Sequence, residues 1–79
     1  MQEASVTRFR TIREDLDVTR ETVLRCAPRT ISLSSIRNAE IGKRVSRRTA
    51  KQLLTAINTL LKEAGEPPVN LDDLGLSIS

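Results

Sequence analysis

The segment from Ser46 to Gly65 constrains the fold most, because it carries a long and regular apolar stripe. Ser46 is a good helix N-cap, since its hydroxyl can accept a free backbone N–H of the first turn. Gly65, followed by Pro67-Pro68, supplies a C-cap glycine and then a stop. The apolar residues at helical spacing are Ala50, Leu53, Leu54, Ile57, Leu60, Leu61 and Ala64. The pattern predicts a helix over 47–64, about 27 Å long, with one buried face.

The rest of the chain has room for shorter helices around this long one. A chain of 79 residues forms one small domain, which buries only roughly 60% of its unfolded surface, so local helical contacts are favoured. A first helix over 6–16 is indicated by apolar residues three or four positions apart: Val6, Phe9, Ile12 and Leu16. Asp17 breaks that helix, Thr19 caps a second one, and Pro28 ends the second at a turn over 28–30.

A third helix is predicted between Ser32 and Gly42. Ser32 is its N-cap and Gly42 stands at the left-handed position after its end. Ile36 and Ala39 can face a core, whereas the outward positions are small or polar: Ser34, Ser35, Arg37 and Asn38. A helix with such a surface suits insertion into a DNA major groove.

The C-terminal part contributes one short helical turn in this interpretation. Asn70 can cap a turn that carries Leu71 and Leu74, while residues 76–79 are expected to be a tail without a structural role. The overall expectation is an all-α, compact five-helix bundle. Its predicted organisation is a flexible N-terminus over 1–5, a helix-turn-helix domain over 6–75 and the tail.

Positive charge is concentrated in one part of the sequence. The chain has 13 basic and 10 acidic residues, a net charge of +3 and a pI near 9.8. Between Arg37 and Lys51 the only acidic residue is Glu40, and the rest of the chain has more acidic than basic residues. The six cations of this segment are Arg37, Lys43, Arg44, Arg47, Arg48 and Lys51. Such a patch is typical of a surface that faces phosphates.

Composition excludes several classes of protein. A lone Cys26 in a chain without histidine makes neither an internal disulfide nor a usual zinc site, so no metal is expected. No apolar run approaches the roughly 20 residues that span a bilayer, and the N-terminus lacks a secretion signal, which favours the cytoplasm. Phe9 is the only aromatic residue, which argues against stacking on single-stranded nucleic acid.

An enzyme is not expected either. The chain has no histidine, no glycine-rich phosphate loop and no G-x-S-x-G elbow, and it leaves little room for a substrate pocket. No cofactor or small-molecule ligand is therefore predicted. Asp72 and Asp73 look like a carboxylate pair, but they also fit the first turn of a short helix. Cys26 is interpreted as a small apolar residue, with a redox switch as the alternative.

An ordered set of residues along the chain carries a resemblance to a known family. The set comprises Phe9, Ile12, Arg13 and Glu14, Val18–Leu24, Ile31-Ser32, Ile36, Ala39, Glu40 and Gly42, Val45–Ala50, and Asn70–Leu74. It resembles the phage-repressor/Cro-like (XRE-like) family of helix-turn-helix DNA-binding domains, also described as lambda-repressor-like, over about residues 6 to 75. The chain departs from the family pattern in a longer connection over Ala27–Ser32 and in Leu24, where the family usually has a small alanine.

The resemblance implies roles for individual residues. Leu33, Ser34 and Asn38 would reach base edges, and the Asn38 amide could pair with adenine. Alternatively, Asn38 is a solvated helix residue, and Leu33 is a core or dimer contact. Residues expected at phosphates are Arg20, Ser35, Arg37, Lys43, Arg44, Arg47 and Arg48. Arg13 and Glu40 stand at positions that form a structural ion pair between the first and third helices.

The leading functional expectation is a sequence-specific regulator that binds double-stranded DNA, most simply a repressor. The resemblance implies a bacterial or phage protein associated with the nucleoid, and a homodimer on half-sites about one helical turn apart. A candidate dimer surface consists of aliphatic residues that look exposed: Leu71, Leu74, Leu76 and Ile78. The alternative is an antitoxin-like or adaptor module that binds a protein partner, with DNA binding secondary.

Overall fold

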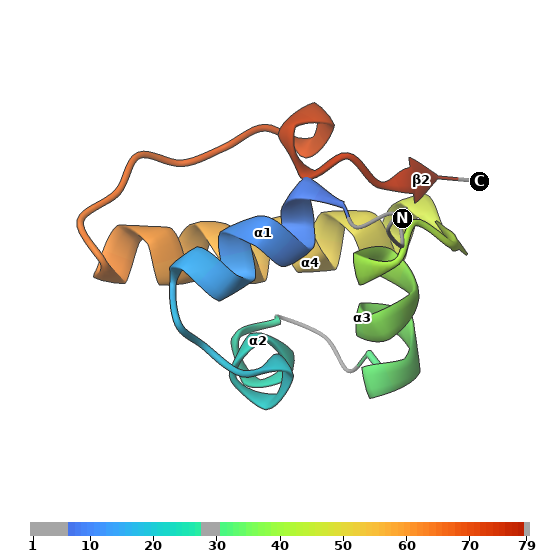
Figure 1. Cartoon of the computed structure of the whole chain (residues 1–79), viewed down its shortest axis with the longest axis horizontal. Coiled ribbons are helices and arrows are strands. Elements are labelled where there is room, and N and C mark those ends of the chain that lie inside the picture. The colour runs from blue at the N-terminus through green and yellow to red at the C-terminus, as the bar shows by residue number, and fades with distance from the viewer. Residues whose placement is uncertain (1–6, 28–30, 79) are drawn as a thin grey trace, which may run out of the picture.

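The computed structural model describes residues 7–27 and 31–78, and the described part is mostly helical (Figure 1). Its elements are α1 (Arg8–Asp15), α2 (Arg20–Cys26), α3 (Leu33–Glu40), β1 (Arg44–Val45), α4 (Arg47–Glu63), the 3₁₀ helix η1 (Leu71–Leu74) and β2 (Ser77–Ile78). The expectation of five helices and no strands is wrong in detail. Within the described residues there are four α-helices, one 3₁₀ turn and a two-stranded parallel sheet.

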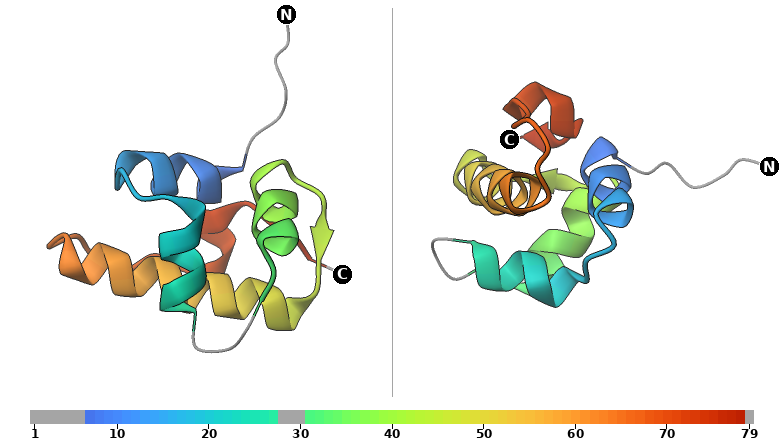
Figure 2. Two further views of the ribbon diagram at one scale, coloured as in Figure 1. Left: turned by 90° about the horizontal axis from the view of Figure 1, so that it is seen from below. Right: turned by 90° about the vertical axis from the view of Figure 1, so that its left-hand side faces the viewer.

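The long helix α4 organises the core. α2 and α3 lie next to each other on one side of α4, and the C-terminal segment lies on the other side (Figures 1 and 2). α2 makes its most extensive contact with α4. Within α4 the small residues Ala50 and Ala56 are completely buried. The large side chains that are completely buried around them are Phe9, Val23, Ile36, Leu53, Ile57 and Leu74.

The stripe predicted along α4 agrees with the buried face except at three positions. Ala56, which the stripe omitted, is buried, whereas Leu54, which it included, is only half-buried and Ala64 is exposed. Ala64 is the C-cap of α4 and the chain turns away at Gly65, whose φ of 77° is left-handed, so the buried face ends one turn earlier. Three sequence predictions lie outside the described residues: the flexible N-terminus over 1–5, the apolar position of Val6 and the turn over 28–30.

Three helix starts are confirmed with the cap residues that the sequence predicted. The hydroxyls of Thr19, Ser32 and Ser46 each accept the backbone N–H of the residue three positions later, at 3.1–3.2 Å. α1 begins at Arg8, later than predicted, and ends before Asp17, whose φ of 58° is left-handed. Aspartate tolerates this conformation better than most residues, so Asp17 ends α1 as expected.

The C-terminal segment, to whose last residues the sequence assigned no role, is part of the fold. It runs back along α4 to the beginning of that helix, where β2 pairs with β1 in parallel, Arg44 with Ser77 and Val45 with Ile78 (Figure 1). Leu74 is completely buried, and the other three aliphatic residues proposed for a dimer surface are partly buried against the core. The prediction of an exposed surface is therefore wrong for Leu74, which the core of this small domain takes up, while the other three side chains remain partly exposed.

Candidate nucleic-acid interface

The exposed side of α3 carries the residues that the sequence predicted to read bases. Leu33 is 38% exposed and Ser34 is exposed, so both are available to a ligand, whereas Asn38 is half-buried. Ile36 and Ala39 point into the core and fix the helix there. The helix therefore exposes Leu33 and Ser34 to a ligand more than it exposes Asn38.

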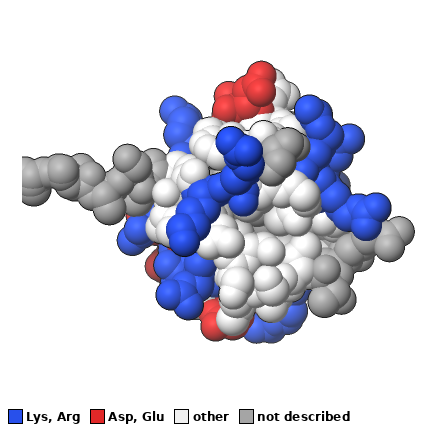
Figure 3. Space-filling model, turned by 90° about the vertical axis from the view of Figure 1, so that its right-hand side faces the viewer, with Lys and Arg blue, Asp and Glu red and all other residues white. Residues whose placement is uncertain are grey.

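The residues predicted to bind phosphates lie around this helix at the surface. Ser35 is half-buried, and its hydroxyl and backbone N–H both contact the cap residue Ser32. The six cations of the segment 37–51 are all exposed: Arg37, Lys43, Arg44, Arg47, Arg48 and Lys51. Figure 3 views the molecule from the side of α3 and β1. Lys and Arg side chains lie at several places on that face around uncharged surface, and acidic side chains lie mainly at its upper and lower margins.

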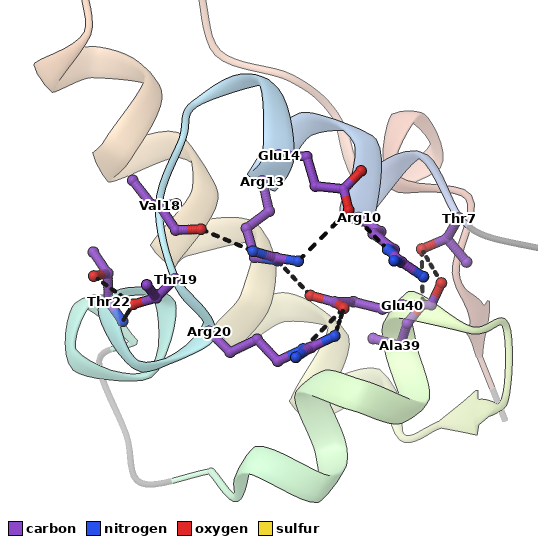
Figure 4. Close-up of polar contacts among 10 residues, drawn as sticks. All are labelled: Thr7, Arg10, Arg13, Glu14, Val18, Thr19, Arg20, Thr22, Ala39 and Glu40. Carbon is purple, nitrogen blue, oxygen red and sulfur yellow. Dashed lines mark hydrogen bonds and ion pairs between the residues drawn. The ribbon is translucent and has the colours of Figure 1, made fainter.

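The single acidic residue of the cationic segment does not reach this surface. Glu40 is the last residue of α3 and is completely buried. Its Oε2 accepts a hydrogen bond from Arg13 Nε of α1 at 2.5 Å, and Arg13 Nη1 also donates to the backbone oxygen of Val18 at 2.8 Å (Figure 4). The ion pair that the resemblance implied between Arg13 and Glu40 is present. It joins α1 to α3 and keeps the only negative charge of the segment 37–51 away from the surface.

Glu40 has a second partner that the sequence interpretation missed. Arg20, at the start of α2, donates from Nε to Glu40 Oε1 at 3.0 Å and places Nη2 at 2.9 Å from the same oxygen (Figure 4). The Arg20 side chain is 40% exposed, compared with 12% for Arg13. The sequence interpretation had assigned Arg20 to phosphate alone. No local signal could link residues 20 positions apart on different helices.

A polar depression lies between α2 and α3. Its volume is about 470 Å³. It is lined by Arg13, Thr19, Arg20, Glu21, Leu33 and Arg37. Three of these six side chains are guanidinium groups and one is a carboxylate, so the depression is positively charged. It is also directly beside the base-reading candidate Leu33.

Thr7 is a further residue that holds α3 in place. Its side-chain hydroxyl donates to the backbone oxygen of Ala39 at 2.8 Å, and its backbone N–H donates to the backbone oxygen of Glu40 at 3.0 Å. These carbonyls belong to the last turn of α3, where no helical donor is available. Thr7 is buried, and a polar residue at a helix start gave no sign of this role in the sequence.

No other feature of the described residues suggests a chemical site. Over residues 7–27 and 31–78, no three His, Cys, Asp or Glu side chains are grouped so that they could hold a metal ion. Cys26 is half-buried and free. Asp73 accepts the backbone N–H of Asn70 at 2.9 Å, which accounts for one member of the predicted carboxylate pair. Across the same residues no helix combines the length and the apolar character needed to cross a bilayer.

Comparison with known proteins adds no assignment to these observations. No family model, curated protein or solved structure matches the chain. The class that the fold and the site define is a small, mostly helical domain with a cationic surface beside one exposed helix.

Proposed function

We propose that this protein binds double-stranded DNA sequence-specifically, with α2 and α3 acting as a helix-turn-helix unit. The observation that carries the proposal is the separation of charge in the segment 37–51. All six of its cations are exposed, while its one acid, Glu40, is buried and bound by two arginines. A surface selected only for solubility has no need for this separation, whereas a phosphate-facing surface does.

The dimensions of α3 support its assignment as the recognition helix. An α-helix with its side chains is about 10–12 Å across, so α3 can enter the major groove of B-DNA, which is about 12 Å wide. In this proposal Leu33 contacts a thymine methyl group, Ser34 a base edge, and the Asn38 amide an adenine. Asn38 turns partly outward from the core, so the DNA contact would complete its burial.

The cations around α3 are assigned to the phosphate backbone. Lys43 and Arg44 lie in the connection after α3, and Arg47 and Arg48 begin α4, so these four would contact phosphates on one side of the groove. Arg37, Ser35 and Arg20 would contact phosphates nearer to the recognition helix. Contacts of this kind set the register of the protein on DNA and make the affinity depend on salt.

The regulatory role proposed is occupation of a promoter or operator, most simply as a repressor. A homodimer remains part of the proposal because two α3 helices would read two half-sites about one helical turn apart. The surface that joins the two copies is left open, since Leu74 belongs to the core and Leu71, Leu76 and Ile78 are partly buried against it. The adaptor alternative is not favoured by any particular contact, and it becomes an outcome of the test.

The test is selection from a random double-stranded DNA library, with enrichment and sequencing at low and at physiological salt. We expect a recovered motif, which is palindromic if the protein binds as a dimer. Asn38→Ala should then relax one position of that motif. Lys62→Ala, an exposed cation in the last turn of α4, is the matched control and should leave the motif unchanged. Recovery of no motif, with affinity lost at physiological salt, would refute sequence-specific binding and favour a protein partner.

A further inference from the structure

We infer that Arg20 acts as a two-sided fork, in which Glu40 holds one edge of the guanidinium and the other edge receives a phosphate of the DNA backbone. In this arrangement Glu40 is a positioning residue, because it acts on the ligand only through Arg20. The inference rests on the proposed function and adds to it the residue that orients one phosphate contact.

The held edge is defined by two short contacts to one atom. Nε and Nη2 of Arg20 lie 3.0 and 2.9 Å from Glu40 Oε1. The other carboxylate oxygen, Oε2, is bound by Arg13, and the Glu40 side chain is 1% exposed. A buried carboxylate with both oxygens bound cannot turn to follow a moving partner. Glu40 therefore fixes the plane and direction of the Arg20 guanidinium.

The opposite edge remains available to a ligand. A guanidinium carries five N–H donors in a rigid plane, and the contact with Glu40 uses only those of one edge. Within the described residues, Nη1 of Arg20 has no hydrogen-bond acceptor. The Arg20 side chain is 40% exposed and lines the depression between α2 and α3, together with Thr19, Leu33 and Arg37. An arginine fixed in this way can present two parallel N–H groups to phosphate oxygens.

Lysine could not perform both tasks at this position. Its ammonium is a compact point charge at the end of a flexible chain, and it lacks the two separate edges of the guanidinium. With lysine at position 20, the buried carboxylate of Glu40 would attract the ammonium and keep it from the phosphate. If Arg20 served only to neutralise Glu40, lysine would replace it without any effect on DNA binding. The two explanations thus make opposite predictions for Arg20→Lys.

The experiment measures binding to a random-sequence DNA duplex by fluorescence anisotropy across a range of salt concentrations. Wild type, Arg20→Lys and Arg20→Gln are compared, with Arg25→Lys as the matched control on an exposed arginine of the same helix. Thermal melts establish that each variant is folded. Each phosphate contact contributes about 0.9 to the slope of log K against log salt. We expect Arg20→Lys to lose this contribution as fully as Arg20→Gln does, and Arg25→Lys to keep the wild-type slope.

The loss of one phosphate contact should change the ratio of the wild-type affinity to the Arg20→Lys affinity as salt is raised. Between about 50 and 200 mM salt, the advantage of wild type over Arg20→Lys should shrink about 3.5-fold. A rescue variant tests the role of Glu40 directly. In Arg20→Lys/Glu40→Gln the position-40 side chain no longer carries a charge that captures the ammonium, so the slope should return toward that of wild type. If the double variant does not fold, the salt slopes of Arg20→Lys and Arg20→Gln alone decide whether the fork exists.

The outcomes separate this inference from the proposed function. Wild-type binding with an unchanged slope in Arg20→Lys would overturn the fork and leave DNA binding intact. Loss of slope in Arg20→Lys together with a folded double variant that stays weak would show that Glu40 does not position the contact, and would also overturn the fork. Absence of wild-type binding to any duplex would overturn both the function and the inference.

Discussion

The side chain of Asn58 binds the backbone of Val69 through both of its amide atoms. Nδ2 donates to the Val69 carbonyl oxygen at 3.1 Å, and Oδ1 accepts the Val69 N–H at 2.9 Å. In this way a residue in the middle of α4 attaches the segment that returns from the end of α4 toward η1. The contact replaces the pairing that a neighbouring strand would give to this extended backbone.

Asn58→Ala should therefore destabilise the fold without affecting the cationic surface. Two hydrogen bonds are lost and two backbone groups are left to water, so we expect a cost of about 1–3 kcal/mol in the free energy of unfolding. For a domain of this size each kcal/mol lowers Tm by roughly 4–8 °C, which a thermal melt resolves. Lys62→Ala on the same helix serves as control and should change Tm little. A melt of Asn58→Ala that equals wild type would contradict the role of this contact.

The ion pairs of Glu40 should differ in their value for stability. Arg13→Met removes a partner that is 12% exposed and leaves part of a buried carboxylate uncompensated, so the expected cost approaches about 3 kcal/mol. Arg20→Met removes a partner that is 40% exposed, and water can replace part of its contact, so about 1 kcal/mol is expected. Urea denaturation measures both values. Equal costs would mean that burial does not determine the strength of these two pairs.

The core position of Leu74 predicts a strong effect from the C-terminal segment. Leu74→Ala removes a completely buried side chain, and such changes typically cost about 2–5 kcal/mol. Ile41→Ala, at a residue that is 46% exposed, is the matched control and should cost much less. Chemical denaturation compares the two. If Leu74 instead formed a dimer surface, its replacement would change the molecular mass in solution and leave the unfolding midpoint of the monomer unchanged.

Ser46 offers a way to separate helix capping from charge. Ser46→Ala loses the hydrogen bond from the Thr49 N–H, measured at 3.1 Å, and should cost about 1 kcal/mol of stability. Ser46→Asp retains an N-cap and should melt near the wild-type temperature. The new carboxylate would, however, stand between exposed Arg44 and Arg47 and weaken DNA binding. A lower melting temperature of Ser46→Asp together with unchanged DNA binding would contradict both the capping role of this position and its closeness to the DNA.

Neutralising the start of α4 should change the salt dependence of binding. If Arg47 and Arg48 each contact a phosphate, Arg47→Gln/Arg48→Gln lowers the slope of log K against log salt by about 1.8. Both residues are exposed, so the melting temperature should remain close to that of wild type. A titration of duplex DNA at several salt concentrations provides the slope. A slope identical to that of wild type would place these cations away from the DNA.

Local chemistry explains which parts of the fold could be predicted from the sequence. Caps at Thr19, Ser32 and Ser46 depend on residues within one turn, and all three form as expected. The spacing of apolar residues over 47–64 likewise predicts most of the buried face of α4 without reference to other segments. By contrast, β1 and β2 contain two residues each, which is too short for any alternating pattern to appear in the sequence. Their pairing joins residues more than thirty positions apart and depends on the path of the C-terminal segment.

The same division applies to the candidate site. The cationic surface could be predicted from the sequence, because the segment 37–51 contains six basic residues and a single acidic one. The binding of Glu40 by two arginines could not be predicted, because it depends on where α1 and α2 place Arg13 and Arg20. Thr7 is a comparable case, since its contacts with the end of α3 span more than thirty residues. Long-range hydrogen bonds of this kind leave no spacing signal for sequence reasoning.

The shared carboxylate of Glu40 also limits how this protein can change during evolution. An apolar residue at position 40 would leave two arginines facing each other without a counter-charge, so it would be tolerated only with replacements at positions 13 and 20. Conversely, the loss of either arginine alone leaves Glu40 and the other arginine in place. Loss of glutamate at position 40 should therefore be accompanied, among relatives of this protein, by replacements at positions 13 and 20.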